Sequence, residues 1–112
     1  MKVLLLLYGD EAAEQALTPQ ERREIVDRHV VFARMLRERG VLVASEALGP
    51  GREAVVVRRG GRVSDGPFAE TKEQLGGFYV LDCGSRDEAV GYARLAPDSP
   101  GLIVEVRPIA DM

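Results

Sequence analysis

The sequence contains one side chain that ordinarily titrates near neutral pH, His29. An imidazole can accept or donate a proton at pH 7, so His29 is a candidate general base or general acid. It falls on the apolar stripe of a predicted helix, where a histidine can also be a core residue satisfied by one hydrogen bond. From this position alone the structural role is favoured over the catalytic one.

An aspartate beside His29 would favour catalysis, because an orienting carboxylate fixes the tautomer of the imidazole and raises its basicity. Asp10 follows the first predicted strand, where the loop to the helix begins, and Asp65 lies in a turn after a predicted hairpin. Either could approach a histidine in the N-terminal half of that helix. The sequence does not choose between them, so both are candidate catalytic partners.

The segment 65–78, DGPFAETKEQLGGF, joins glycine-containing turns to several charged groups. Functional residues are often found on such loops. Lys72, one of only two lysines, could bind an anionic group, although a solvated ion pair with a neighbouring glutamate explains it as well. With Phe68 from this loop and Tyr8 from the first strand, it completes our set of candidate substrate-binding residues.

Metal and redox chemistry find little support in the sequence. One cysteine excludes an internal disulfide, and one cysteine with one histidine makes a zinc site improbable. Cys83 ends an apolar strand and has no basic neighbour, which favours an inert buried thiol. No phosphate-binding or dinucleotide-binding motif is present. We therefore expect no metal site and no cofactor.

The size and charge of the chain limit the classes of function that remain. The 112 residues, 12.2 kDa in mass, correspond to a single domain over 1–112. The net charge of −3 predicts no nucleic-acid partner. The apolar run 3–8 is too short for a signal peptide or a membrane span, so we expect a cytoplasmic protein without membrane contact.

The strongest secondary-structure signal in the sequence predicts the helix that carries His29. Thr18 and Glu21 form a capping-box pattern around Pro19, which is favoured at the first helical position. Apolar residues then recur with helical spacing, and Gly40 supplies a left-handed C-terminal cap. The pattern predicts a helix between Thr18 and Gly40 that presents His29 on its apolar face.

The other elements follow from apolar runs and turn residues. A second helix begins after Ser85, with Glu88 completing a capping box, and Pro97 stops it. The predicted strands are Lys2–Tyr8, Val41–Leu48, Glu53–Arg58, a short return strand at 63–64, Gly77–Cys83 and Gly101–Pro108. This order predicts an α+β fold, a ferredoxin-like βαββαβ unit with both helices on one face of an antiparallel sheet.

Several predicted strands lack the alternation of apolar and polar residues that is expected when one face of an antiparallel sheet is exposed to water. Val3–Tyr8 is apolar throughout, and so are Val41–Ala44 and Phe78–Leu81. Two short helices can cover only one face, and a second copy packed sheet to sheet is the simplest cover for the other. The sequence therefore predicts a homodimer.

The motif DGPFAETKEQLGG at 65–77 resembles the signature of the DGPF branch of the YCII-related domain family. The opening LYGD at 7–10 and the ending VEVRP at 104–108 are similar to the same branch, so the resemblance covers nearly the whole chain. It implies a dimeric α/β barrel of ferredoxin-like subunits. It also implies that His29, placed as the family's helix histidine is, forms an active site with an aspartate.

Two hypotheses of function follow. In the first, His29 with Asp10 or Asp65 removes a proton from a small organic substrate, in a lyase, isomerase or dehydrochlorinase reaction; the resemblance links one branch of the family to dehydrochlorination. In the second, the protein is a ligand-binding or regulatory module whose 65–77 loop meets an extracytoplasmic-function sigma factor. The resemblance motivates that partner, because DGPF proteins are often encoded beside such factors. Whether the protein is an enzyme stays open at this point.

Overall fold

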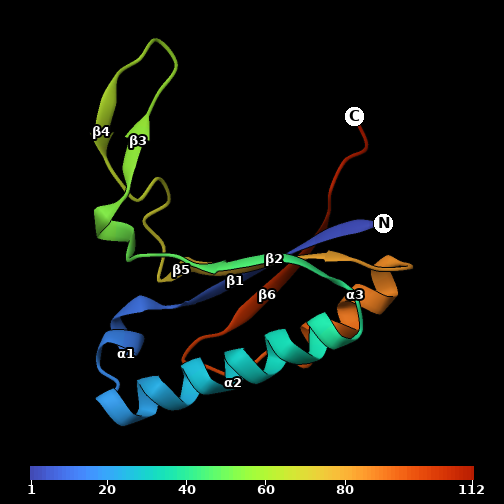
Figure 1. Cartoon of the computed structure of the whole chain (residues 1–112). Helices are drawn as coiled ribbons and strands as arrows, with labels where there is room; N and C mark the ends of the chain where they lie inside the picture. Colours follow the sequence, from blue (N-terminus) through green and yellow to red (C-terminus); the bar gives the residue numbers. More distant parts are fainter.

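A computed structural model describes residues 1–112 and shows an antiparallel sheet with helices on one face and a hairpin projecting from the other side (Figure 1). The four strands of the sheet lie in the order β2-β5-β1-β6. Their bounds are β1 Lys2–Asp10, β2 Leu42–Ala47, β5 Glu73–Asp82 and β6 Ile103–Pro108. The helices are α1 Glu11–Gln15, α2 Pro19–Glu38 and α3 Arg86–Ala93. The predicted α+β class and antiparallel sheet are confirmed.

Helix α2 forms as its sequence signals predict. The Thr18 hydroxyl accepts a hydrogen bond from the Glu21 N–H, and the Glu21 carboxylate accepts one from the Thr18 N–H. At the other end Arg39 caps the helix and Gly40 takes a positive φ of 71°. None of the helices in the structure is long and apolar enough to cross a membrane.

Alternate residues of each central strand point to opposite faces of the sheet. On β1, Val3, Leu5 and Leu7 face the helices and are buried, whereas Leu4 and Leu6 lie on the open face and are only partly buried. The register pairs Leu5 with Tyr79 of β5. The core therefore lies between the sheet and α2 and α3. Its buried residues are Val3, Leu5, Leu7, Phe32, Leu36, Val41, Tyr79, Leu81, Cys83, Ala89 and Tyr92.

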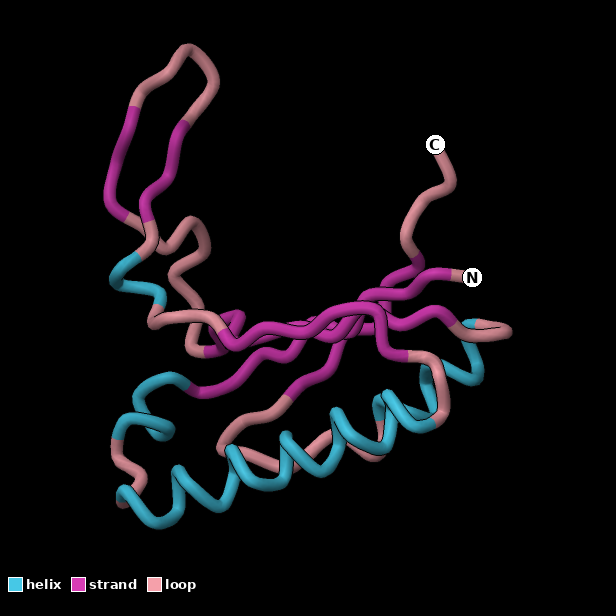
Figure 2. Tube along the Cα trace, in the orientation of Figure 1, coloured by secondary structure: helices cyan, strands magenta, loops and turns pink.

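The segment between β2 and β5 leaves the main sheet, as the tube in Figure 2 shows. A short 3-10 helix, η1 (Gly51–Glu53), leads into strands β3 (Val55–Val57) and β4 (Val63–Asp65). These strands pair only with each other, in a hairpin that we call the arm. The observed strand is thus shorter at both ends than the predicted Glu53–Arg58, and Glu53 belongs to η1. The hairpin turn at 59–62 is confirmed by the positive φ angles of Gly60 and Gly61.

Three other local predictions need correction. Helix α1 was not expected, because its five residues carry no apolar periodicity; it forms because the Asp10 carboxylate caps it at Ala13 N–H. Helix α3 ends at Ala93, before Pro97. Ser85 does cap α3, but the Glu88 carboxylate accepts its hydrogen bond from Gly84 N–H rather than completing a reciprocal box.

The glycine pair before Phe78 marks a β-bulge, as its sequence suggests. Leu7 pairs with Gly77 and Tyr8 with Leu75, so Gly76 is the extra residue of β5. A Cβ atom on Gly77 would lie 3.1 Å from the Glu46 carbonyl oxygen of neighbouring β2. Gly77 therefore allows close backbone packing between β5 and β2, and Gly76 forms the bulge beside it.

Candidate functional site

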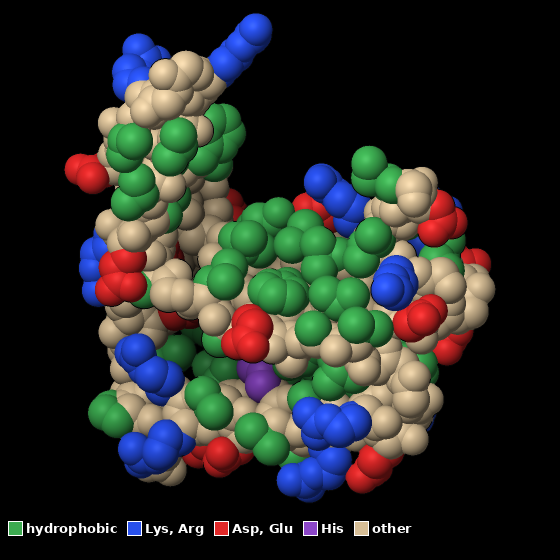
Figure 3. All heavy atoms as spheres, turned by 45° about the horizontal axis from the view of Figure 1, so that its top comes forward, with side chains coloured by type: hydrophobic (Ala, Val, Ile, Leu, Met, Phe, Trp, Pro, Cys, Tyr) green, Lys and Arg blue, Asp and Glu red, His purple; other side chains and the backbone are tan.

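A cavity of about 500 Å³ lies between the N-terminal half of α2 and the sheet, and His29 lines it. Figure 3 shows the histidine in a hollow with hydrophobic side chains around it. The apolar lining comes from α2, from the strands and from two loops that precede α2 and β6. Its members include Leu7, Leu17, Ile25, Val26, Val30, Ala33, Tyr79 and Leu102. The site therefore combines an apolar chamber with one imidazole.

His29 is held by Tyr79 of β5. The Nδ1 atom lies 2.7 Å from the Tyr79 hydroxyl oxygen, and the two rings stack with an interplanar angle of 14°. Phe32, one turn along α2, packs edge-on against the same tyrosine. Because Tyr79 is buried in the core, this contact fixes the imidazole against a rigid strand.

The protonation states in the cleft follow from burial. Burial lowers the pKa of His29, and the positive charge of Arg28 lowers it further. Burial also raises the pKa of Tyr79 to about 12. At pH 7 the pair therefore consists of a neutral imidazole and a neutral phenol.

The hydrogen bond allows two tautomers of the neutral imidazole. When Tyr79 donates its O–H to Nδ1, Nε2 carries the proton and can donate to a ligand. When Nδ1–H donates to the Tyr79 oxygen, Nε2 has a free lone pair and can accept a proton. A doubly protonated imidazolium keeps the second arrangement, so the contact survives protonation.

Three charged residues that the sequence analysis missed also line the cleft: Glu14 of α1, Arg22 of α2 and Glu46 of β2. Burial, and then the nearby Glu11 and Asp10 charges, raises the pKa of Glu14. Arg22 donates to the Glu14 carbonyl oxygen at 3.3 Å. Arg22 could have been found from its spacing, since it precedes His29 by two helical turns. Glu14 gave no signal, because α1 itself was not predicted.

Neither predicted aspartate contacts His29 within this chain. Asp10 caps α1 and forms an ion pair with Lys72, with 3.5 Å between Oδ2 and Nζ. Asp65 is exposed at the end of β4, on the arm. The hydrogen-bond partner of His29 is Tyr79, and the proposed roles of both aspartates stay predictions.

The predicted binding residues are dispersed. Tyr8 lines the cleft, but its hydroxyl donates to Glu105 of β6 at 3.1 Å. Phe68 is 76% exposed after the arm, with the Arg58 guanidinium 5.9 Å from its ring centre. Lys72 is bound to Asp10, and neither Lys72 nor Phe68 lines the cavity.

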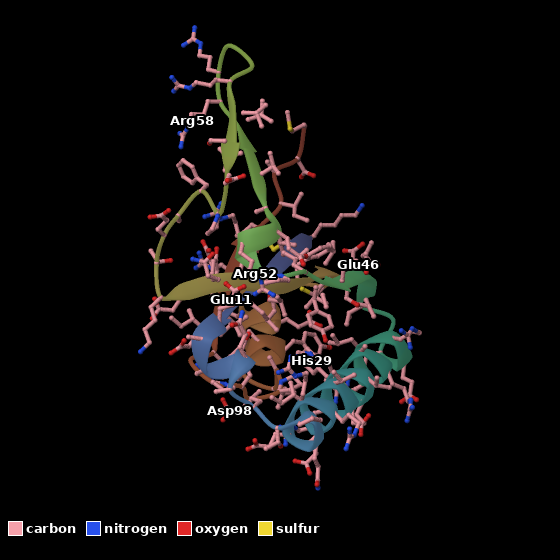
Figure 4. The ribbon with its side chains drawn as sticks, turned by 90° about the vertical axis from the view of Figure 1, so that its left-hand side faces the viewer. Glu11, His29, Glu46, Arg52, Arg58 and Asp98 are labelled. Carbon is pink, nitrogen blue, oxygen red and sulfur yellow. The ribbon has the colours of Figure 1, made fainter.

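A smaller cavity of about 320 Å³ adjoins the first, and Glu14, Arg22 and Gly76 line both. Arg52 of η1 and Glu11 of α1 both line the smaller cavity, and Figure 4 shows them next to each other in projection, with His29 on α2 below them. No group of three or more His, Cys, Asp or Glu side chains is arranged to hold a metal ion. The combined site offers an imidazole, the phenols of Tyr8 and Tyr79, three carboxyl groups and two guanidinium groups.

Comparison with known proteins identifies relatives of the whole chain. Residues 1–112 match the model of the YCII-related domain. The chain is also 39% identical, over 115 aligned positions, to an uncharacterized protein of Rhizobium meliloti (strain 1021). That alignment covers 98% of this chain and 93% of the relative, so the similarity extends over the cleft, the arm and both ends of the sheet.

Proposed function

The chain belongs to the YCII-related domain family, and on that premise we propose that it is a cofactor-free enzyme that moves a proton on a small organic substrate bound in the His29 cleft. The observation that carries this proposal is the neutral, oriented imidazole lining an apolar cavity large enough for a small molecule. The motif at 65–77 supports the further proposal that the chain belongs to the DGPF branch.

In the proposed reaction His29 Nε2 removes a proton from a carbon next to a carbonyl group, or from a phenol. Nδ1–H then donates to the Tyr79 oxygen, which orients the imidazolium as an aspartate would. The electron pair left on the substrate forms an enolate or phenolate beside the new positive charge. Return of the proton to another carbon gives isomerisation. Loss of a leaving group such as chloride gives elimination, and the imidazolium proton is released to water.

Hydrogen exchange tests this proposal without requiring knowledge of the product. A panel of small carbonyl compounds and phenols is incubated with the protein in D₂O, and loss of C–H signals is followed by NMR. We expect the protein to accelerate exchange for at least one compound, and we expect His29→Gln to abolish the acceleration. Exchange that is equally fast with His29→Gln would remove His29 from the mechanism.

A separate variant tests the role of Tyr79 in orienting the imidazolium. Tyr79→Phe retains the ring that packs against Phe32 but removes the oxygen that receives Nδ1–H. We expect exchange to slow by about tenfold, which corresponds to the loss of one charge-assisted hydrogen bond of about 1.5 kcal/mol. Glu14→Gln tests whether the missed carboxyl group takes part as well.

We also propose that the protein is a homodimer that packs through the open face of the sheet. Hydrophobic side chains gather on this face (Figure 3). Leu4 and Leu6 of β1 lie there beside Phe78 and Val80 of β5, because cross-strand partners share a face. Burying them against a second copy would remove a continuous apolar surface from water.

Sedimentation equilibrium tests the dimer. The wild-type protein should sediment at about twice 12.2 kDa at micromolar concentration. Leu4→Lys should shift it to monomer, because a charge would be buried at the seam. Val31→Lys is the control, because Val31 is exposed and lies outside the sheet. A wild-type monomer would overturn this proposal but not the assignment of His29.

The arm supports a second candidate function, docking of a protein such as an extracytoplasmic-function sigma factor. Val55, Val57 and Val63 on the arm are exposed, and so is Phe68 at its end. Exposed apolar side chains on a hairpin are suited to contact another protein. Copurification of a sigma factor that is lost in Phe68→Ser but retained in His29→Gln would support this function. Absence of any sigma factor would count against it.

A further inference from the structure

We infer that the ligand of the cleft is an organic anion, an apolar body whose carboxylate binds between Arg22 and Arg52 in the smaller cavity. This inference rests on the proposed function, because it takes the His29 chamber to be the place where the body of the substrate binds. It adds the chemical class of the substrate and a specificity determinant that the sequence analysis did not contain.

The two cavities have different linings. The His29 chamber is lined mostly by apolar side chains, whereas the adjoining cavity of about 320 Å³ has only two hydrophobic residues in its lining, Leu48 and Leu75. Glu14, Arg22 and Gly76 line both cavities, so one ligand can extend from the first into the second. A molecule that fits both has an apolar part and a polar end.

The two guanidinium groups at the polar end are available to a ligand. Neither Arg22 nor Arg52 forms an ion pair within the chain; the ion pairs involve Met1, Lys72 and Arg107. The only hydrogen bond from the Arg22 side chain goes to a carbonyl oxygen, which leaves most of its donors free. A guanidinium group presents paired donors that match a carboxylate.

Two carboxyl groups border the same cavity and have to be accounted for. Glu11 accepts a hydrogen bond of 2.7 Å from the Gly51 N–H, which ties α1 to η1 and partly satisfies its charge. Burial raises the pKa of Glu14, so this carboxyl group takes up a proton more readily than an exposed one. A protonated Glu14 can donate a hydrogen bond to an incoming carboxylate instead of repelling it.

The separation of Arg22 and His29 along α2 sets the length of a ligand that contacts both. Arg22 precedes His29 by two turns, which separates their backbones by roughly 10 Å along α2. Ile25 and Val26 lie between them and line the chamber. An aromatic ring or a short branched chain against these side chains would place an acid group near Arg22 and a reactive C–H or O–H near His29.

Matched acid and amide probes test the inference on the full-length chain. Benzoate, phenylacetate and cinnamate are each compared with the corresponding primary amide, which has nearly the same shape without the charge. Dissociation constants are measured by isothermal titration calorimetry. We expect at least one acid to bind about tenfold or more tightly than its amide, and Arg22→Gln to remove that preference.

Three variants distinguish this effect from a general change of charge. Arg23→Gln removes the same charge from the next residue of α2, which lines neither cavity, and should keep the preference. Arg52→Gln should reduce it. Arg22→Lys keeps the charge without the paired donors and should give an intermediate preference. Thermal unfolding of each variant confirms that it is folded.

The outcomes separate this inference from the proposed function. Amides that bind as tightly as acids, a preference that survives Arg22→Gln, or an absence of binding by every acid would each overturn the inference. If the acid preference depends on Arg22 while proton exchange does not depend on His29, the anion site stands and the proposed enzyme fails. The reverse result would keep the enzyme and exclude the anion site.

Discussion

The two halves of α2 carry the same apolar stripe but have different surroundings. In the C-terminal half, Phe32 and Leu36 pack into the core, and Leu36 is 0% exposed. In the N-terminal half, Val26 and Val30 face a cavity, and Val26 is 56% exposed. One helix therefore builds the core with its second half and the wall of a binding chamber with its first.

This difference shows that helical periodicity identifies a face but not what covers it. Apolar residues in the second half are covered by the sheet and by α3, whose buried members belong to the same core cluster. Those of the first half face a chamber that a ligand could fill. His29 lies at the boundary, where Tyr79 joins the core to the chamber.

The largest effect is expected in the core half. Leu36→Ala removes a fully buried side chain and leaves a cavity, so the free energy of unfolding should fall by about 2–5 kcal/mol. Urea denaturation measures the loss. A change below about 1 kcal/mol would mean that the two halves of α2 do not differ as described.

At the boundary, Tyr79→Phe should lower the free energy of unfolding by about 0.5–1.5 kcal/mol at neutral pH, because one hydrogen bond is lost. The tyrosine also carries a pH signature. Its pKa rises from 10.0 to about 12 on folding, so stability present below pH 10 falls as the pH rises toward 12. Tyr79→Phe should lack this alkaline fall. A wild-type curve identical to that of the variant would contradict the burial of the phenol.

His29 should produce the opposite pH dependence. Its pKa in the folded chain is lower than the ordinary value of 6.5, so the unfolded chain binds more protons as the pH falls below 6.5. Stability is therefore complete above pH 6.5 and decreases as the pH falls toward the lowered pKa. We expect His29→Gln to lose this acid-side dependence, and NMR titration of the imidazole should give a midpoint below 6.5 in the wild type.

The smallest effect on stability is expected in the cleft half. Val30→Ala should change the free energy of unfolding by less than about 0.5 kcal/mol, because Val30 is half exposed. The same substitution should weaken binding of an apolar ligand, because Val30 lines the chamber. A large loss of stability would show that this half is packed by protein rather than left open for a ligand.

Most of the sheet and α2 could be predicted because their signals are local. The capping box at Thr18, the left-handed Gly40 and the glycine bulge before Phe78 each depend on a few neighbouring residues. Helix α1 and the separation of the arm could not be predicted in this way. Helix α1 has a local cap at Asp10 but only five residues, too few for apolar periodicity, and the hydrogen bond from Gly51 N–H to the Glu11 carboxylate joins segments 40 residues apart.

The site was only partly predictable for the same reason. His29 was identified because it is the one histidine, but its partner Tyr79 lies 50 residues away along the chain. Residue type suggested an aspartate as the partner, whereas the register of β5 places a phenol beside the imidazole. Arg22 shares the helix face of His29 and could have been predicted from its spacing. Glu14 could not have been predicted in this way, because it lies on α1, which the sequence did not predict.

The bulge at Gly76 determines to which face of the sheet the first residues of β5 point. Tyr8 pairs with Leu75 and Gly9 with Gln74, so Gln74 shares the side of Gly9 and reaches the polar cavity. There its side chain holds the preceding loop through the carbonyl oxygens of Ala69 and Thr71. Deleting Gly76 would shift β5 by one position and move Gln74 to the opposite side. One glycine thus decides on which side of the sheet the Gln74 side chain lies.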